Sequence, residues 1–367
     1  MRCRGCGSDG CVTVLDVGRV PAADHFPSAT EPFDPSENAN PLAMAVCPTC
    51  GLAQLEDDDT VTDEPRGIEP QALRDQAEAA VSDVAAAGLL HGGTVAEFGS
   101  PHGGTWLPLL TERGFTPIDS ARSGAADVVL DCFGIMHDAD QSAAFARRAA
   151  LTAPTGVLLL QFHSITTIVT EGQWNALRHG HFAYYSLTSI TRLLARQAMV
   201  VTRVWEYDLY GGTILLAAAH AATGAQPDES VHRILTREEH ARVDDPGYTA
   251  ALQQICTAQW DDLRGWLVDA SARGQRVYAY GAASRAVALF SGARLTSHLL
   301  CGVADASPGK QGRRMPGTDI PIISPEELVA ATPDAVLVTV PDLVDEVARR
   351  FPTLAPMLCT EPKKVSA

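Results

Sequence analysis

The sequence predicts an α/β protein in which a small cysteine-bearing module precedes two doubly wound domains. Three observations lead to this prediction. The 367 residues exceed what one hydrophobic core usually supports. Two CxxC pairs lie in the first fifty residues, and at two distant places a short apolar strand runs into a glycine-bearing turn and a helix. Alternation of strands and helices favours parallel sheets covered by helices.

The two CxxC pairs, Cys3/Cys6 and Cys47/Cys50, predict a metal-stabilised module over residues 1–60. Four thiolates in two short loops supply the tetrahedral sulfur ligands of a structural zinc site. The segment between the pairs is rich in proline and glycine, which is too irregular for a self-sufficient core. Disulfides or a dithiol redox site are the alternative, but no thioredoxin-like βαβ pattern surrounds either pair. We therefore expect zinc as a structural cofactor.

A helical linker is expected over residues 61–92. The stretch 56–70 is polar and contains prolines, as connecting segments do. Apolar residues then recur at helical spacing from Gln71 to Leu90, and Gly92-Gly93 ends the pattern.

The first α/β domain is expected over residues 93–223. The segment TVAEFG predicts a buried strand that enters a turn, and TWLPLLTER predicts the helix after it. Two further apolar strands begin at Ala125 and Gly156, with an alanine-rich helix between them. The sequence around Gly211-Gly212 predicts an antiparallel hairpin that closes the sheet.

A polar helical connector is expected over residues 224–273, followed by a second α/β domain over residues 274–367. A strand that ends at Tyr280 runs into a glycine turn and a helix, and further strands begin at Leu299 and Ala335. The predicted fold class is therefore α/β, with an N-terminal zinc-binding module plus two Rossmann-like doubly wound domains.

Composition narrows the classes of partner. The net charge is −16 and no cluster of Lys and Arg appears, which argues against a nucleic-acid partner. No apolar run is long enough to cross a bilayer, and the N-terminus lacks the apolar stretch of a signal peptide. Free thiols in a zinc signature suit a reducing compartment, so we expect a cytoplasmic protein that acts on a small molecule.

Several segments together resemble one family of bacterial enzymes. They are PLAMAVCPTCGLAQL, GHFAYYSLTSITRLL, YGGTILLA, YGAASRAVAL, DASPGKQGRRMPGTDIPIISPEEL and PDAVLVTV. They are similar to the S-adenosylmethionine-dependent C-methyltransferases that act on nucleotide-linked keto-deoxysugars in antibiotic biosynthesis. The similarity runs along nearly the whole chain. It implies a class I methyltransferase domain between the zinc module and a C-terminal Rossmann-like domain.

The resemblance implies a histidine base. A keto group acidifies the hydrogen on its neighbouring carbon, and a base must remove it before the enolate attacks a methyl group. The family's Tyr-His-Glu-His segment corresponds here to Arg178-His179-Gly180-His181, and His137 in GIMHDAD matches another family histidine. His181 is the first candidate for the base, His137 the second, and His179 a weaker one. Arg178 replaces a phenol with a fixed cation and is expected to hold an anionic substrate or an enolate oxygen.

Other ligand contacts are also expected from the resemblance. The family's cofactor turn corresponds to residues 97–103, and a following acidic residue binds ribose hydroxyls. The expected cofactor-binding residues are Glu97, Gly99, Gly103 and Asp119. The expected substrate-binding residues are Tyr184, Tyr210, Tyr280 and Arg285.

Two features of the sequence leave open whether the protein uses S-adenosylmethionine as a methyl donor. Pro101-His102 replaces the family's Asn-Asp pair, and Pro101 removes one backbone donor from the turn. Only seven residues separate Asp119 from Asp127, whereas a crossover needs about ten to twelve. We therefore expect a shortened first sheet that lacks its third strand.

Three functions remain compatible with these features. The first is a C-methyltransferase that uses S-adenosylmethionine on a nucleotide-linked keto-deoxysugar or another activated ketone. The second is a descendant that has given up the methyl donor and uses the histidines for proton transfer, as an epimerase, isomerase, eliminase or cyclase. The third is a non-catalytic binding protein.

Overall fold

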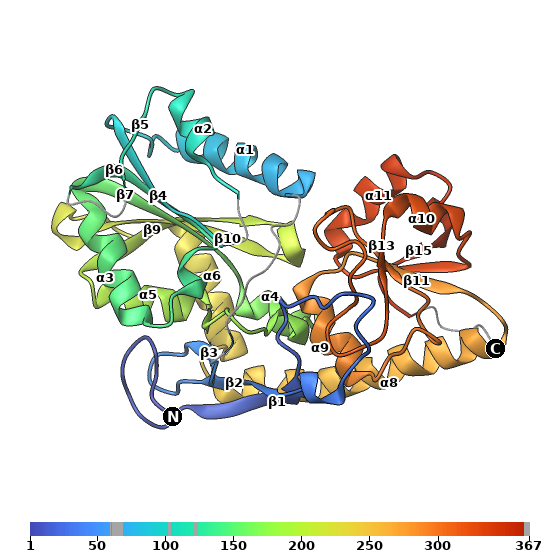
Figure 1. The fold of residues 1–367 in the computed structure, drawn as a ribbon. Helices are drawn as coiled ribbons and strands as arrows, with labels where there is room; N and C mark the ends of the chain where they lie inside the picture. Colours follow the sequence, from blue (N-terminus) through green and yellow to red (C-terminus); the bar gives the residue numbers. More distant parts are fainter. Residues whose placement is uncertain (59, 61–68, 102–103, 120–123, 363–367) are drawn as a thin grey trace.

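The computed structural model describes residues 1–58, 60, 69–101, 104–119 and 124–362. Their strands form three sheets, one in each of the N-terminal, central and C-terminal parts of the chain. In Figure 1 the central sheet lies between two layers of helices, and the C-terminal sheet lies beside it. No helix of the described residues is long and apolar enough to span a membrane.

The N-terminal sheet has four antiparallel strands, and the fourth comes from a distant part of the chain. The strands, in sheet order, are β1 (Val12–Val20), β2 (Asn40–Val46), β3 (Ala53–Leu55) and β8 (Ala183–Tyr184). Strand β3 pairs with β8 through Ala53–Tyr184 and Gln54–Ala183. The cysteine module therefore holds a segment that the sequence places in the methyltransferase-like domain.

The central sheet has six strands in the order β5-β4-β6-β7-β10-β9. The first four are mutually parallel, and the closing pair is antiparallel, as the pattern around Gly211-Gly212 predicts. Strand β6 follows β5 directly in the described chain, so the predicted loss of the third strand is confirmed there. The bounds are β4 (Thr94–Phe98), β5 (Thr116–Pro117), β6 (Ala126–Cys132), β7 (Thr152–His163), β9 (Met199–Tyr207) and β10 (Thr213–His220).

Helices cover both faces of the central sheet. Helices α1 (Gln71–Ala86) and α2 (Leu107–Thr111) pack on one face, where Ala80, Val81 and Leu110 are fully buried. Helices α3 (Gln141–Leu151) and α5 (Leu187–Ala195) cover the other face. A short helix, α4 (Ile165–Thr170), follows β7.

The C-terminal sheet is entirely parallel, in the order β13-β12-β11-β14-β15. Its second strand begins at Val303 and not at Leu299, because the preceding residues form a turn in which Leu300 N donates to Thr296 O. The elements are β11 (Val277–Tyr280), α9 (Ser284–Gly292), β12 (Val303–Ala304), β13 (Ile322–Ile323), α10 (Pro325–Ala330), β14 (Ala335–Val338), α11 (Val344–Arg350) and β15 (Leu358–Cys359).

The connector consists of α6 (Glu229–Ala241), α7 (Pro246–Thr249) and α8 (Ala251–Ala272). Helix α8 links two cores. Near its start the Gln253 side chain bonds the backbone of Asp16 in β1, and further along Leu263 and Leu267 enter the C-terminal core. Short 3-10 helices complete the chain: η1 (Pro35–Glu37), η2 (Ile135–His137), η3 (Trp174–Ala176), η4 (Leu209–Gly211), η5 (Ala221–Thr223), η6 (Pro341–Leu343) and η7 (Ala355–Met357).

Candidate functional site

A cavity of about 300 Å³ opens at the carboxyl ends of β6 and β7, where the central sheet meets the C-terminal domain. This volume lies at the lower end of the range for ligand pockets. Its wall combines apolar side chains, such as Leu73, Trp106 and Met136, with a dense polar group. The charged and histidine residues of its lining are Glu69, His137, His163, Arg178, His181, Arg285 and Lys310.

His137 and His181 meet inside this cavity. Their ring centroids are 4.5 Å apart, and the rings are perpendicular. His137 lies in η2 directly after β6, and its Nδ1 is 2.9 Å from the carbonyl oxygen of Gly180. A carbonyl only accepts, so Nδ1 of His137 carries the proton and the lone pair of the neutral ring is on Nε2. The structure therefore places both of these predicted histidines in one cavity.

Arg178 connects the histidine pair to the C-terminal domain. Its Nε donates to Nε2 of His181 at 2.8 Å, and its Nη1 donates to Oγ of Ser284 at 2.6 Å. A guanidinium never accepts a hydrogen bond, so it holds His181 in the tautomer with its lone pair on Nε2. Ser284 is the first residue of α9, and the N-terminus of that helix therefore faces the cavity.

The zinc module fixes the segment that carries Arg178 and His181. Gly180 N donates to a carboxylate oxygen of Asp58, and Leu55 N donates to Phe182 O. Phe182 N in turn donates to Met136 O at 2.7 Å, which ties this segment to η2. Together with the β3–β8 pairing, these bonds hold both histidines against each other.

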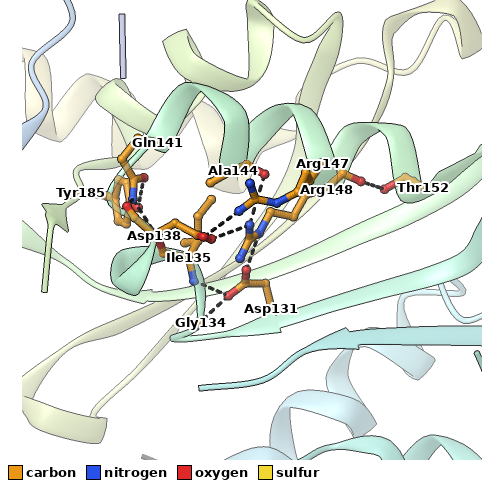
Figure 2. Close-up of polar contacts among 10 residues, drawn as sticks. All are labelled: Asp131, Gly134, Ile135, Asp138, Gln141, Ala144, Arg147, Arg148, Thr152 and Tyr185. Atoms are coloured by element: carbon orange, nitrogen blue, oxygen red, sulfur yellow. Dashed lines mark hydrogen bonds and ion pairs between the residues drawn. The ribbon is translucent and has the colours of Figure 1, made fainter. Parts of the chain in front are cut away.

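A buried ion pair shapes the turn that carries His137 (Figure 2). Arg148 of α3 donates from Nε to Asp131 at 2.6 Å, and both side chains are almost completely buried. The other oxygen of Asp131 accepts from the backbone N–H groups of Gly134 and Ile135, directly before His137. The Arg148 guanidinium also lies 4.1 Å from the ring centroid of Phe98, at the end of β4.

Arg285 and Tyr210 form the wall beside the histidines. The guanidinium carbon of Arg285 lies 5.9 Å from the ring centroid of Tyr210, and that ring lies 6.2 Å from the ring of His163. Burial, then the nearby charges of Arg285 and Arg178, lower the pKa of His163 to about 3. Burial raises the pKa of Tyr210, so its phenol stays protonated at neutral pH. The cavity therefore has a positive field.

Three predicted site residues lie elsewhere or have other partners. His179 is buried away from the cavity, and its Nε2 bonds the carbonyl of Pro41 in β2, which contradicts the predicted catalytic role. Tyr280 packs in the C-terminal core with Leu328 and Val336, which contradicts the predicted substrate contact. Tyr184 lines the cavity, but its hydroxyl bonds Arg178 N and Ala176 O, so it is a support.

Three of the four residues predicted to hold the cofactor, Glu97, Gly99 and Asp119, are not part of the described cavity lining. Glu97 accepts hydrogen bonds from Thr105 Oγ1 at 2.5 Å and Trp106 N at 2.7 Å, so its carboxylate shapes the turn before α2. Burial raises the pKa of this carboxyl. Gly99 and Asp119 are exposed and are not part of the cavity lining. Gly103 lies outside the described residues, and the neighbouring turn residues Ser100, Pro101 and Gly104 do line the cavity.

The four predicted zinc ligands form one cluster. The sulfur atoms of Cys3, Cys6, Cys47 and Cys50 all lie within 4.8 Å of one another. The Cys3–Cys50 and Cys6–Cys47 sulfur distances are both 3.6 Å, and all four thiols are free. A zinc ion with bonds of about 2.3 Å separates its tetrahedral ligands by about 3.8 Å. The cluster therefore fits a structural zinc ion.

Two charged residues of the cavity were missed by sequence reasoning. Lys310 is buried, and its ammonium donates to Ala282 O and lies 4.8 Å from the ring centroid of Phe26. Glu69 lies directly before α1. Only the rarity of lysine in this chain could have drawn attention to Lys310, and no local pattern distinguishes Glu69.

Comparison with known protein families finds a match in the N-terminal part and another in the C-terminal part of the chain. A family model described as "C-methyltransferase C-terminal domain" matches residues 208–355, and one described as "Putative zinc binding domain" matches residues 3–61. C-methyltransferase NovU of Streptomyces niveus is 26% identical over an alignment that covers 94% of this chain and 91% of that protein.

Solved methyltransferase structures resemble this chain more weakly. Magnesium protoporphyrin IX methyltransferase of Synechocystis is 14% identical, covers 42% of this chain and 90% of its own, and has a TM-score of 0.30. The 1,6-didemethyltoxoflavin-N1-methyltransferase of Burkholderia thailandensis is 13% identical, covers 46% and 94%, and has a TM-score of 0.32. At these scores the likeness adds nothing to the assignment. The two domain matches and the near full-length relative show that this chain is similar to C-methyltransferases.

Proposed function

We propose that this protein is an S-adenosylmethionine-dependent C-methyltransferase. It removes a proton from a carbon next to the carbonyl of an activated ketone and directs the resulting enolate to a methyl group. The observation that carries this proposal is the pair His137 and His181, set edge to face in a cavity that the turn after β4 also lines.

His137 is the better placed base of the two. Its Nδ1 proton is held by Gly180 O, so the neutral ring has its basic lone pair on Nε2. The corresponding lone pair of His181 already accepts from Arg178. These bonds favour His137 as the base, whereas His181 is the first candidate from the sequence. His181 and Arg178 then position His137 and its substrate.

The positive field of the cavity suits the charge that forms during this reaction. Loss of the proton places negative charge on the carbonyl oxygen, and preorganised cations stabilise such charge without reorganisation. Arg178 and Arg285 both line the cavity, and the N-terminus of α9 adds its partial positive charge. The protonated phenol of Tyr210 is a further hydrogen-bond donor in the same wall.

S-adenosylmethionine supplies an electrophilic methyl group when it is bound. Ser100, Pro101, Gly104 and Trp106 are the residues that would contact it, because they belong to the turn and helix after β4 and line the cavity. The exposed Asp119, just after β5, remains the candidate for contact with ribose hydroxyls.

A second function on the same scaffold is favoured by the missing third strand. Without the third strand, the sheet offers less surface to enclose the adenosine of S-adenosylmethionine. The histidine pair, in contrast, needs no cofactor to move a proton. An epimerase, isomerase, eliminase or cyclase would use His137 in the same way and return or relocate the proton.

Calorimetric titration of the zinc-loaded protein with S-adenosylmethionine and S-adenosylhomocysteine tests the methyltransferase. Saturable binding of one molecule per chain is expected. Absence of heat at millimolar ligand would overturn the methyl-donor assignment and favour the cofactor-independent enzyme. Deuterium uptake from D₂O next to the carbonyl of a ketone probe, followed by NMR, reports proton transfer in either case, and its absence with every ketone would favour a binding protein.

A further inference from the structure

Three neutral polar side chains in the cavity lining leave part of their hydrogen-bonding capacity unused. Gln76 lies in α1, and Gln161 and His163 lie at the carboxyl end of β7. Residues two positions apart in a strand point to the same face of a sheet, so His163 shares the face of Gln161, and Gln161 bonds Gln76 of α1. None of the three belongs to the proposed acid–base pair.

The two glutamines retain one free donor and one free acceptor. Gln161 Nε2 donates to Gln76 Oε1 at 2.8 Å. Gln161 is completely buried and Gln76 is 9% exposed, yet Gln161 Oε1 and Gln76 Nε2 have no hydrogen-bond partner among the described residues. Reversing both amides would leave the same combination of one donor and one acceptor. Buried polar atoms without a partner are costly and uncommon, so a ligand that joins them would explain their retention.

His163 adds a second acceptor beside the amides. The carbonyl of Tyr210 accepts a hydrogen bond from the ring, and Nε2 has no partner in the part of the chain that the structure describes. The proton of the neutral ring is therefore on Nδ1 and the lone pair on Nε2. Burial, followed by the charges of Arg285 and Arg178, lowers the pKa of His163 to about 3, so the ring accepts a hydrogen bond without taking the proton.

The order of the strands places these side chains on the far side of the histidine pair from the predicted cofactor turn. Neighbouring strands of the central sheet run β4-β6-β7. Ser100 follows β4, His137 follows β6, and Gln161 and His163 end β7. A substrate whose reacting carbon lies at His137 therefore has the cofactor turn on one side and the neutral side chains on the other.

We propose that Gln76, Gln161 and His163 bind a hydroxyl group of the substrate. A hydroxyl donates and accepts at once, so it can use a free donor and a free acceptor together. A site built to bond a hydroxyl discriminates against an analogue that lacks it, because the buried polar atoms are then left unpaired. This inference rests on the proposed function of the cavity and assigns three residues that select hydroxylated ketones.

Saturation-transfer NMR on the full-length zinc-loaded protein tests this assignment with matched ketones. The probes are 2-, 3- and 4-hydroxycyclohexanone, each compared with the methylcyclohexanone that carries its methyl group at the same position. The series varies the distance between the carbonyl and the hydroxyl. At least one hydroxy ketone should bind about tenfold or more tightly than its methyl counterpart. Equal affinities in every pair, or no measurable binding of any hydroxy ketone, would overturn the proposal.

Two variants separate recognition from packing. Gln76→Leu/Gln161→Leu should lose most of the hydroxyl preference and keep or raise the midpoint of thermal unfolding, because apolar side chains replace a partly satisfied polar pair. His163→Phe should weaken the preference independently. Gln71→Leu, at the exposed start of α1, is the control and should keep it. An undiminished preference in either the double variant or His163→Phe would contradict the role assigned to those residues.

Two further measurements on the same samples distinguish this proposal from the function on which it rests. S-adenosylhomocysteine should bind the native protein and the double variant equally. A loss of its affinity with the hydroxyl preference unchanged would assign the glutamines to the methyl donor and overturn the proposal. Absence of deuterium uptake into every ketone, beside an intact hydroxyl preference, would refute the proton-transfer chemistry and still support the hydroxyl subsite.

Discussion

His137 and His181 differ in their ability to accept a proton from a substrate, although their rings are in contact. The proton on Nδ1 of His137 is fixed by a backbone carbonyl, while Nε2 of His181 is occupied by Arg178. A positioned histidine base contributes on the order of 10²–10⁴-fold to a rate. We expect His137→Gln to lower deuterium uptake into the ketone substrate at least about a hundredfold, and His181→Gln to lower it less.

The exposed His298 provides the matched control for this prediction. His298→Gln should leave the NMR-measured uptake unchanged, and circular dichroism should show that all three variants are folded. Full uptake in His137→Gln would transfer the role of base to another group of the cavity.

His163 makes stability depend on pH. Its pKa in the folded protein is about 3, compared with about 6.5 for an unperturbed histidine. The unfolded chain therefore binds the extra proton first, and the folded state loses stability as the pH falls from about 6.5 towards 3. Between pH 7.5 and 5.5 this residue should account for a loss of about 1.4 kcal/mol in unfolding free energy.

Urea unfolding at the two pH values measures that loss. His163→Gln should reduce the difference between pH 7.5 and 5.5 by this amount, whereas His298→Gln should not reduce it to the same extent. An equal difference in the native protein and in His163→Gln would contradict the assigned cause.

The sequence predicts which segments form the site, but the role of each residue in a segment depends on the local direction of the backbone, which only the structure shows. His181 and His179 are two positions apart, yet Gly180 adopts a left-handed conformation (φ 78°), and the two side chains point to different surroundings. Tyr280 ends a strand inside the C-terminal core, while Arg285, five residues later, reaches the cavity. The resemblance located both segments correctly but could not choose between these neighbours.

At the scale of elements, an ion pair between α3 and β6 supports the turn that leads into η2. Arg148 is 2% exposed and pairs with the fully buried Asp131, whose second oxygen caps the turn before His137. Removing one partner of a buried pair leaves an uncompensated charge and costs about 3–5 kcal/mol. We expect Arg148→Met to lower the urea unfolding free energy by this amount and to reduce proton transfer in the fraction that remains folded.

Arg147 is the matched control, because it comes from the same helix and pairs with Asp138 at the surface, where its side chain is 52% exposed. Arg147→Met should cost about 0–1 kcal/mol. Equal losses in the two variants would show that the buried pair has no special role.

Elements with a strong hydrophobic pattern were predictable, and very short ones were not. The apolar runs of β4, β6 and β7 and the hairpin β9–β10 follow from the sequence, and so does the missing strand after Asp119. Strands β8, β12, β13 and β15 have two residues each, which is too few for an alternating pattern. The pairing of β3 with β8 joins residues about 130 positions apart, and no local signal announces it.

At the scale of the molecule, the zinc module supports the cavity as well as its own fold. Its strand β3 and the carboxylate of Asp58 hold the segment from Gly180 to Tyr184. We expect one zinc ion per chain by atomic absorption in the native protein. Cys47→Ser should lose the zinc and, with it, most of the deuterium uptake into the substrate, because the sheet that positions His181 is no longer anchored.

Cys11→Ser is the control, because Cys11 lies within the module but is not one of the four clustered cysteines. This variant should keep both its zinc and its proton-transfer activity. Full activity in a zinc-free Cys47→Ser protein would show that the support does not depend on the metal.

The pairing of β3 with β8 also limits how related genes can exchange pieces. A recombination point between codons 55 and 183 would take β3 from one parent and β8 from the other. The paired residues Gln54 and Ala183 would then come from different parent sequences. Chimaeras that break the chain on either side of this interval keep both strands from a single ancestor. The productive recombination points should therefore cluster outside the interval between β3 and β8.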